Sequence, residues 1–304
     1  MSDKNKIIVI LGSTASGKTA LAVELARKLD GEIVSADSRQ VYRGMDIGTG
    51  KDLESYGDLP YHLIDVADPK EVFDLAQFKK LAEAAIADIT SRAKVPIVVG
   101  GTGLYLEALI SNFQLAEVPA DDSLREELER KTIEELFGMI QKYNTNFAAN
   151  INNSDLNNKR RLIRYVEVFA GSGQVTKKAE SLYQTLIIGL DCPKEELQSR
   201  IEARLMKRLD EQEMVEEVND LNRQGVAWER LESFGLEYKF IAWYLQDKID
   251  YEEMVERLQK ASWQFAKRQL TWFRRWERSG QKINWLGPDD GARAYELALR
   301  FLRD

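Results

Sequence analysis

Residues 7–19 read Ile-Ile-Val-Ile-Leu-Gly-Ser-Thr-Ala-Ser-Gly-Lys-Thr, an apolar run that passes directly into a glycine-rich turn. The run is continuous and β-branched, as a buried parallel strand requires. Apolar residues at helical spacing follow the turn as far as Leu29. The turn fits the phosphate-binding pattern G-x-x-x-x-G-K-[ST]. The stretch therefore predicts a strand, a phosphate-binding loop and a helix in that order.

Each part of such a loop has a chemical role. Glycines let successive backbone N–H groups converge on one anion, and the helix presents its positive end to the same anion. Lys18 adds a mobile positive charge, and the hydroxyl of Thr19 is a candidate Mg²⁺ ligand. The motif predicts binding of a phosphate or diphosphate and leaves the rest of the ligand open. The predicted binding residues are Gly12, Ser13, Thr14, Ala15, Ser16, Gly17, Lys18 and Thr19.

Short apolar runs alternate with helical patterns over the first part of the chain. Strands are expected at 7–11, 32–35, 61–66 and 96–99, and helices at 19–29 and 75–90. Such alternation is typical of α/β proteins with right-handed crossovers. It predicts a doubly wound parallel sheet core of the P-loop NTPase kind.

The pattern changes after about residue 118. The next segments are a charged helical stretch at 121–143, an Asn-rich polar stretch at 144–158 and a basic helix at 159–169. The chain then returns to the earlier style, with a strand at 185–191, helical sequence at 193–247, one long helix at 251–278, a short strand at 283–286 and a terminal helix. We therefore predict an α/β core of 1–118 and 184–304, interrupted by a mostly helical insertion domain at 119–183.

Composition excludes several classes of protein. The chain has 304 residues and a net charge of −7, which argues against a wholly basic nucleic-acid coat protein but allows a local basic patch. A single cysteine, Cys192, and a single histidine, His62, exclude an intramolecular disulfide, a cysteine-based zinc site and a multi-histidine metal centre. From their flanking residues both are interpreted as structural. Neither a membrane-spanning run nor a signal peptide is present. We expect a cytoplasmic monomer without a membrane partner.

Asp37 follows the second expected strand. Ends of adjacent parallel strands converge on the ligand crevice of a doubly wound sheet, so Asp37 is expected near the phosphate-binding loop. There it could take a proton from a nucleophile or hold Mg²⁺ through water, whereas the alternative interpretation is a helix N-cap. The strand at 96–99 ends in Gly-Gly-Thr-Gly and carries no acid, which disfavours a nucleotide-driven motor or switch.

Several further motifs occur in order along the chain. They lie at 35–42, 44–49, 62–65 and 100–105, and again at 161–167, 200–204 and 266–273. Together with the phosphate-binding loop they resemble the tRNA dimethylallyltransferase family, also called isopentenyl-tRNA transferases, in its bacterial form. The resemblance implies that a dimethylallyl group moves from dimethylallyl diphosphate to N6 of the adenosine 3′ of the anticodon in tRNA, with release of diphosphate. The implied partners are a tRNA anticodon stem-loop, dimethylallyl diphosphate and Mg²⁺.

The resemblance also assigns roles to residues. The loop 12–19 would hold the donor diphosphate rather than ATP, Asp37 would act as general base on the adenine amine, and Thr102 and Arg204 would lie near the departing diphosphate. Asp37 and Thr102 are also expected to contact tRNA. The other expected tRNA contacts are Ser38, Arg39, Gln40, Arg125, Arg160, Arg161, Leu162, Ile163, Arg164, Lys267, Arg268 and Gln269.

The segment 260–278 combines cations with aromatic residues. Its cations are interpreted as RNA phosphate contacts, whereas Phe265, Trp272 and Trp276 recur at helical spacing and are interpreted as core residues. The chain departs from the family pattern at Tyr61, at 144–150, at 157–158 and at Gly50, which stands where alanine is commoner. Three other functions stay open: prenylation of free adenine nucleotides, an ATP-dependent small-molecule kinase, and RNA binding without catalysis.

Overall fold

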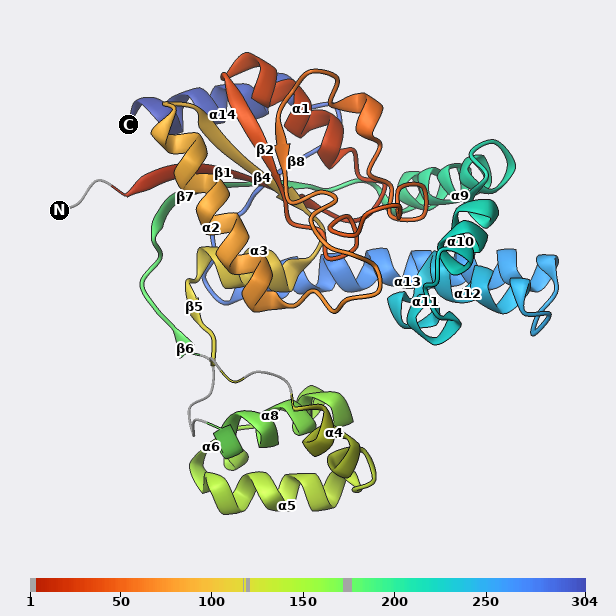
Figure 1. The fold of residues 1–304 in the computed structure, drawn as a ribbon. Helices are drawn as coiled ribbons and strands as arrows, with labels where there is room; N and C mark the ends of the chain where they lie inside the picture. Colours follow the sequence, from red (N-terminus) through yellow and green to blue (C-terminus); the bar gives the residue numbers. More distant parts are fainter. Residues whose placement is uncertain (1–3, 117, 119–120, 172–176) are drawn as a thin grey trace. The chain divides into compact units, whose positions relative to one another are not determined.

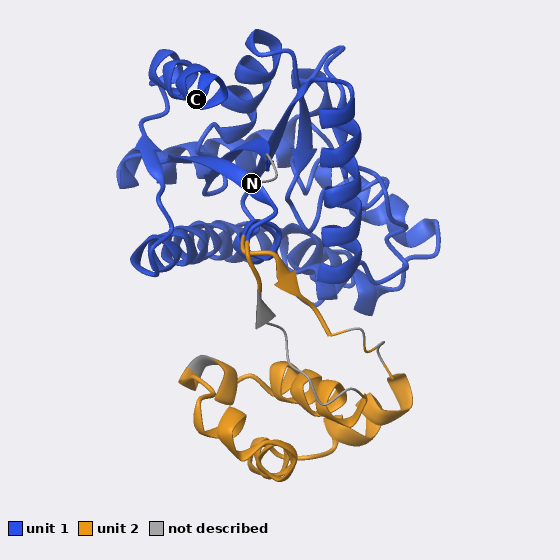
Figure 2. Cartoon of the chain, turned by 90° about the vertical axis from the view of Figure 1, so that its left-hand side faces the viewer, with its two compact units in different colours: residues 1–110, 181–304 blue, residues 111–180 orange. Residues whose placement is uncertain are grey.

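The computed structural model describes residues 4–116, 118, 121–171 and 177–304. The chain forms two compact units, Met1–Ile110 with Ser181–Asp304 (unit 1) and Ser111–Glu180 (unit 2), which Figure 2 colours separately. Unit 2 thus begins before the insertion predicted at 119–183 and also ends earlier. It includes a short antiparallel pair between β5 (Phe113–Gln114) and β6 (Lys177–Lys178), which is too short to leave a sequence pattern.

Unit 1 is built on a parallel sheet of six strands in the order β3-β2-β4-β1-β7-β8, which confirms the predicted fold class. Four strands stand at the centre, where burial on both faces explains their continuous apolar sequences. The strands are β1 (Asn5–Gly12), β2 (Gly31–Ser35), β3 (Tyr61–His62), β4 (Val95–Gly100), β7 (Tyr183–Leu190) and β8 (Asn284–Leu286).

Helices cover both faces of this sheet (Figure 1). Alternate residues of β1 face opposite sides, so Ile8 and Ile10 pack under α1 (Lys18–Lys28) and α14 (Gly291–Arg303). Ile7, Val9 and Leu11 pack on the other side under α2 (Leu75–Ser91), α3 (Gly103–Ile110) and the long helix α13 (Tyr251–Arg278).

A layer of helices extends unit 1 beyond the sheet. It has an apolar cluster of its own, to which Leu205, Met214, Leu231, Tyr238 and Leu258 contribute. The helices are α9 (Lys194–Asp210), α10 (Met214–Arg223), α11 (Trp228–Phe234), α12 (Leu236–Leu245) and part of α13, and a single-turn helix η1 (Leu53–Ser55) lies in the segment after β2. None of the described helices combines the length and apolarity that crossing a membrane requires.

Unit 2 is helical and has its own core, formed by residues such as Leu128, Leu136, Ile140 and Leu162. Its helices are α4 (Asp122–Glu129), α5 (Ile133–Tyr143), α6 (Thr145–Ala149), α7 (Asn153–Leu156) and α8 (Lys159–Gly171). The helical stretch expected at 121–143 is divided in two because Thr132 caps α5 and forms a capping box with Glu135.

One predicted strand is much shorter than expected. The strand predicted at 61–66 pairs only over Tyr61–His62, since Leu63 and Asp65 have φ values of 64° and 58° that end the extended chain. The buried ammonium of Lys51 binds the Asp65 carboxylate there, and it also donates to the carbonyl of Tyr42 at 2.7 Å. The apolar spacing of 61–66 could not reveal this turn.

Candidate active site

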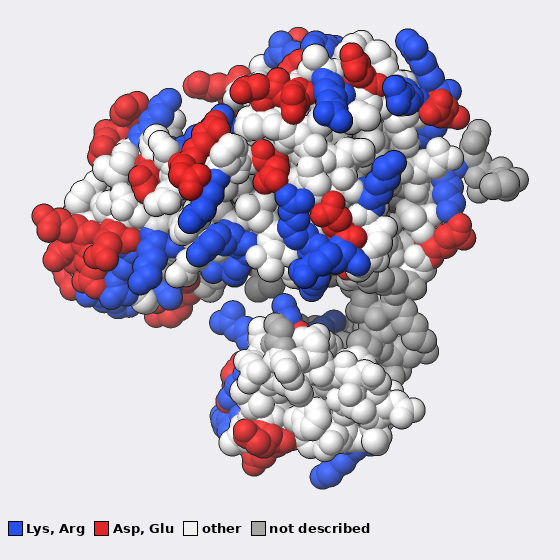
Figure 3. Space-filling view, turned by 180° about the vertical axis from the view of Figure 1, so that it is seen from behind, with Lys and Arg blue, Asp and Glu red and all other residues white. Residues whose placement is uncertain are grey.

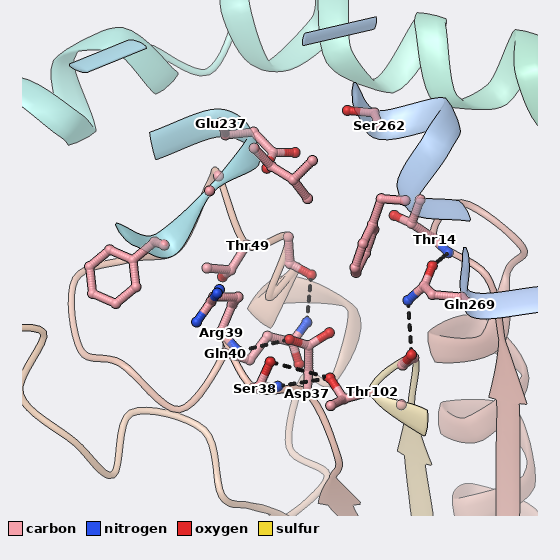
Figure 4. A pocket seen from close by; sticks show the side chains of 18 of the residues that line it. Thr14, Asp37, Ser38, Arg39, Gln40, Thr49, Thr102, Glu237, Ser262 and Gln269 are labelled. Atoms are coloured by element: carbon pink, nitrogen blue, oxygen red, sulfur yellow. Dashed lines mark hydrogen bonds between the residues drawn. The ribbon is translucent and has the colours of Figure 1, made fainter. Parts of the chain in front are cut away.

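A cavity of about 600 Å³ opens in unit 1 at the carboxyl ends of β1, β2 and β4. Its walls come from the phosphate-binding loop, the segment after β2, the loop after β4 and helices α9, α11, α12 and α13. This is where ligands bind in open α/β sheets. Figure 4 shows the side chains that face it.

The phosphate-binding loop is folded for an anion. Gly17, at φ 90°, precedes α1, and no side chain caps that helix, so its first N–H groups stay available. The ammonium of Lys18 donates to the carbonyl of Ser13 at 3.2 Å. Burial lowers the pKa of Lys18 to about 8, against the opposing effect of Asp37 and with a further contribution from Arg204. Both the N–H groups and Lys18 are placed to gain from an incoming negative charge.

Asp37 lies in a turn rather than at the start of a helix, so the N-cap interpretation is wrong. Its Oδ1 accepts from the backbone N–H of Arg39 at 2.9 Å, which fixes the carboxylate. Among the described residues its Oδ2 accepts no hydrogen bond, and Asp37 lines the cavity. The carboxylate is thus oriented and keeps one oxygen for a ligand.

Thr102 lies beside Asp37 because the loop after β4 packs against the segment after β2 (Figure 4). Its Oγ1 accepts from the N–H of Ser38 at 3.1 Å and is 3.4 Å from the Ser38 hydroxyl. The loop needs glycine for this approach, since a Cβ on Gly100 would overlap the carbonyl oxygen of Ala36. Gln40, also on the cavity wall, donates to the carbonyl of Gly50 at 2.9 Å.

Gln269 joins two loops of the site from α13. Its Oε1 accepts from the N–H of Thr14 at 2.8 Å, and its Nε2 donates to the carbonyl of Gly101 at 3.0 Å (Figure 4). The side chain is buried and its amide is engaged at both ends. This side chain therefore positions the phosphate-binding loop, and the expected tRNA contact of Gln269 stays a prediction.

Two arginines bring positive charge into the cavity. The guanidinium of Arg204, on α9, donates to the hydroxyl of Thr14 in the phosphate-binding loop. Burial, with a contribution from Arg208, lowers the pKa of Arg204 to about 10. Burial also lowers the pKa of Arg39, whose guanidinium lies 5.5 Å from the ring centre of Phe234. The cavity therefore holds cations that have lost much of their hydration.

Helix α13 divides its side chains between the core, the cavity and the solvent. Lys267 and Arg268 are exposed, and Arg268 also lines the cavity rim. The core interpretation is confirmed for Trp276, which is buried, and Trp272 is partly buried against the same apolar cluster. Phe265 and Trp272 also line the cavity. On one face of unit 1, Lys and Arg side chains gather along an edge, while Asp and Glu concentrate at one end (Figure 3).

In unit 2 most predicted RNA-contacting arginines are paired with acids. Arg125 donates to both oxygens of Glu167, at 2.6 and 3.2 Å, and Arg164 lies 3.3 Å from the same buried carboxylate. Arg161 pairs with Asp155, and Arg160 is exposed.

Two residues predicted to contact tRNA, Leu162 and Ile163, have their side chains in the core of unit 2, and their contact with tRNA stays a prediction. The side chains of Leu162 and Ile163 are 0% and 4% exposed in the core of the unit, because the apolar face of α8 packs there.

Sequence reasoning missed several cavity residues. They are Gly48, Thr49, Arg208, Glu237, Tyr238 and Lys239. A signal was available for Arg208, because Arg200, Arg204 and Arg208 recur every four residues on one helix and so share a face.

The comparison with known families agrees with this geometry. The model of the IPP transferase family matches residues 40–276, and that of the isopentenyl transferase family matches residues 5–59. The chain belongs to the IPP transferase family. Its isopentenyl transferase match covers the phosphate-binding loop and Asp37, and its IPP transferase match covers Thr102, Arg204 and Gln269.

Individual family members are similar over nearly the whole chain. A tRNA dimethylallyltransferase 2 of Treponema denticola is 48% identical over 94% of this chain and 97% of its own length. The crystal structure of a tRNA isopentenylpyrophosphate transferase from Bacillus halodurans has a TM-score of 0.74 and 35% identity, covering 99% of this chain and 97% of that one. A eukaryotic dimethylallyltransferase acting on tRNA has a TM-score of 0.80 and 27% identity, covering 97% and 77%.

Proposed function

We propose that this chain transfers a dimethylallyl group from dimethylallyl diphosphate to N6 of the adenosine 3′ of the anticodon in tRNA and releases diphosphate. The observation that carries the proposal is one cavity lined by a phosphate-binding loop, by a carboxylate with one oxygen unpaired among the described residues, by partly buried cations and by apolar side chains. Family relatives named tRNA dimethylallyltransferases support it.

The donor diphosphate would lie on the phosphate-binding loop. As the bond from C1 to oxygen breaks, negative charge grows on the diphosphate, and the loop N–H groups, Lys18 and Arg204 stabilise it. The apolar wall, which includes Leu205, Phe240 and Phe265, fits the five-carbon tail.

Magnesium fits this site through Thr19, which lines the cavity beside Lys18. No cluster of three His, Cys, Asp or Glu side chains among the described residues could hold a metal alone, so the donor phosphates would supply most ligands, as Mg²⁺ prefers. When bound, Mg²⁺ supplies charge neutralisation on the diphosphate.

The acceptor adenine would enter beside Asp37. Its amine nitrogen forms the bond to C1, the C1–oxygen electron pair leaves with the diphosphate, and Asp37 Oδ2 accepts the amine proton. Oδ1, held by the N–H of Arg39, keeps Oδ2 in place. The base must leave its stack to reach this point, and the aromatic side chain of Trp272 lies on the cavity wall.

The remaining RNA would be gripped through phosphates. Lys267 and Arg268 on α13 and Arg160 on α8 are exposed cations suited to this task. We assign tRNA contacts also to Ser38, Arg39 and Gln40 at the cavity and to the exposed edges of Arg125, Arg161 and Arg164 in unit 2. We further propose that the enzyme is cytoplasmic and monomeric, and sedimentation with and without RNA tests the oligomeric state.

The proposal is tested by intact-mass analysis of RNA. The protein is incubated with Mg²⁺, dimethylallyl diphosphate and an unmodified anticodon stem-loop with adenines 3′ of the anticodon, and AMP and ATP serve as parallel acceptors. The expected result is a gain of one dimethylallyl group on the RNA alone. Prenylated AMP or ATP would assign the chain to free-nucleotide chemistry, and ATP consumption without any prenyl transfer would indicate a kinase.

A further inference from the structure

Three arginines form a row along one face of α9, and two of them, Arg204 and Arg208, line the cavity. Arg200, Arg204 and Arg208 are spaced by four residues, so they lie on one face of the helix. The guanidinium of Arg200 approaches Gly17, with Nη1 4.0 Å from the position of a Cβ added there. The guanidinium of Arg204 binds Thr14. The row thus runs from the phosphate-binding loop along the wall, and Arg208 continues it by one turn.

Arg208 is buried without enough partners. Its side chain is 5% exposed, and the nearest carboxylate among the described residues is that of Glu237, with Nη1 3.9 Å from Oε1. Its Nη2 has no hydrogen-bond partner among the described residues. A guanidinium has five N–H donors, and leaving a buried charged donor unpaired destabilises the fold. The arrangement lacks an acceptor.

Gly50 makes the room that Arg208 occupies. A Cβ on Gly50 would overlap Nη2 and lie 3.0 Å from Cζ of the guanidinium. Gly50 has a φ of 64°, and its carbonyl is held by Gln40 at 2.9 Å, so the backbone cannot easily retreat. The position of the Arg208 guanidinium therefore requires glycine at residue 50.

The electrostatics of the cavity favour an anionic ligand. Arg208 contributes to lowering the pKa of both Lys18 and Arg204, so the three cations lie within range of one another. The acids that face them are Asp37, Asp52 and Glu237. Burial raises the pKa of Glu237, which weakens its value as a counter-charge. A ligand with negative charge on two adjacent groups would relieve this repulsion.

We propose that Arg208 is a further binding residue for the donor diphosphate, admitted by Gly50 and restrained by Glu237. The inference rests on the proposed function, because dimethylallyl diphosphate is the ligand that brings a diphosphate to this cavity. Arg204 and Arg208 then bind the diphosphate from successive turns of α9. In the absence of diphosphate, the carboxylate of Glu237 is the ion-pair partner of Arg208, and the diphosphate competes with it.

The test is calorimetric binding of inorganic pyrophosphate with Mg²⁺ to the full chain, together with the KM for dimethylallyl diphosphate. Arg208→Met removes the charge and keeps most of the side chain's length. We expect the Kd of pyrophosphate and the KM for dimethylallyl diphosphate each to rise about tenfold to a hundredfold. Lys207→Met is the matched control, because Lys207 is the exposed neighbour on the same helix, and it is expected to leave both constants unchanged. Gly50→Ala is expected to weaken pyrophosphate binding in the native background but to add little in Arg208→Met.

Glu237→Gln separates ligand binding from a merely structural ion pair. If Arg208 serves the diphosphate, loss of the competing carboxylate leaves pyrophosphate binding unchanged or tightens it severalfold. If the pair only supports the fold, Glu237→Gln and Arg208→Met weaken binding alike, and the inference is overturned. Pyrophosphate binding by Arg208→Met equal to that of the native chain also overturns it.

The same experiments distinguish this inference from the proposed function. A native chain that prenylates RNA while its Arg208→Met variant keeps a normal donor KM refutes the inference alone. A native chain that binds pyrophosphate through Arg208 but modifies no RNA refutes the proposed function and leaves the diphosphate site standing. A native chain that binds no pyrophosphate refutes the inference.

Discussion

Glu32 and Asp37 stand at the two ends of β2, and their carboxylates have opposite surroundings. Glu32, at the amino end, is 2% exposed and accepts from both terminal nitrogens of Arg92, with Nη2 at 2.8 Å. His62 Nε2 lies 2.8 Å from it, and Lys94 3.5 Å. Asp37, beyond the carboxyl end, has one oxygen bound by a backbone N–H and the other without a partner among the described residues.

The comparison distinguishes charged groups that stabilise the fold from charged groups that are available to bind a ligand. At the amino end every strong partner is supplied by the chain itself, so the charges contribute to stability. At the carboxyl end Lys18 and Arg204 are half-buried and Arg208 is buried, and Nη2 of Arg208 has no hydrogen-bond partner among the described residues. Groups held in this way bind a ligand strongly because little of their interaction is already used. Substitution at the two ends should therefore affect different measurements.

The largest effect is expected from Asp37→Asn. The amide keeps the size and the turn but cannot accept the amine proton, so single-turnover prenyl transfer should fall about a thousandfold. The unfolding midpoint and binding of the RNA stem-loop should stay near native values. Rapid-quench kinetics with labelled donor measures the rate. A rate within threefold of the native one would remove Asp37 from the chemistry.

The reverse outcome is expected at the other end of the strand. Glu32→Gln removes the charge that Arg92 and His62 share in a buried position, which should lower the free energy of unfolding by about 3 kcal/mol. Single-turnover prenyl transfer below the unfolding transition should be unchanged. Urea unfolding together with the same kinetic assay checks both. A large loss of rate in the folded variant would contradict the division of roles.

The free energy of unfolding should depend on pH because of Glu32. The hydrogen bonds from Arg92 lower the pKa of Glu32 to about 2, whereas an unfolded chain has the ordinary value near 4.5. A depressed folded pKa means stability that is present above the unfolded pKa and is lost as the pH falls toward the folded one. About 2–3 kcal/mol should therefore disappear between roughly pH 5 and pH 2. Urea titrations at stepped pH should show a slope that is shallower in Glu32→Gln.

Local sequence was enough for the parts of the site that are continuous in the chain. The strand, the loop 12–19 and Asp37 follow from spacing and from the convergence of parallel strands. Partners of the loop that lie far along the chain, such as Arg204 on α9 and Gln269 on α13, meet Thr14 only through the fold. Composition cannot say which arginine will find an acid and which will not.

The burial of Gln269 can be predicted from the helical periodicity of its segment. Its neighbours Lys267 and Arg268 are exposed, which suggested a continuous RNA-contacting segment. Along α13, however, Ala266, Gln269 and Phe273 are buried at helical spacing. Position 269 therefore belongs to the inner face, where an amide needs internal partners. The short strand β3 is a different case. In the turn after it Asp65 pairs with the buried ammonium of Lys51, and no local sequence pattern predicts this pair.

The smallest effect is expected from the exposed cations of α13. The side chains of Lys267 and Arg268 are exposed to solvent, so Lys267→Ala and Arg268→Ala should each weaken stem-loop binding only several-fold at moderate salt. Each should also reduce the slope of log K against log salt concentration by about 1, because one phosphate contact is lost.

Lys28→Ala is the matched control for these variants. Lys28 is an exposed lysine on α1 that pairs with Glu24 at 2.6 Å, and its loss should leave the salt dependence of binding unchanged. Filter-binding titrations across a salt series measure all three variants. If the α13 variants keep the native slope, the exposed cations of this helix are solvated surface charge and do not contact RNA phosphates.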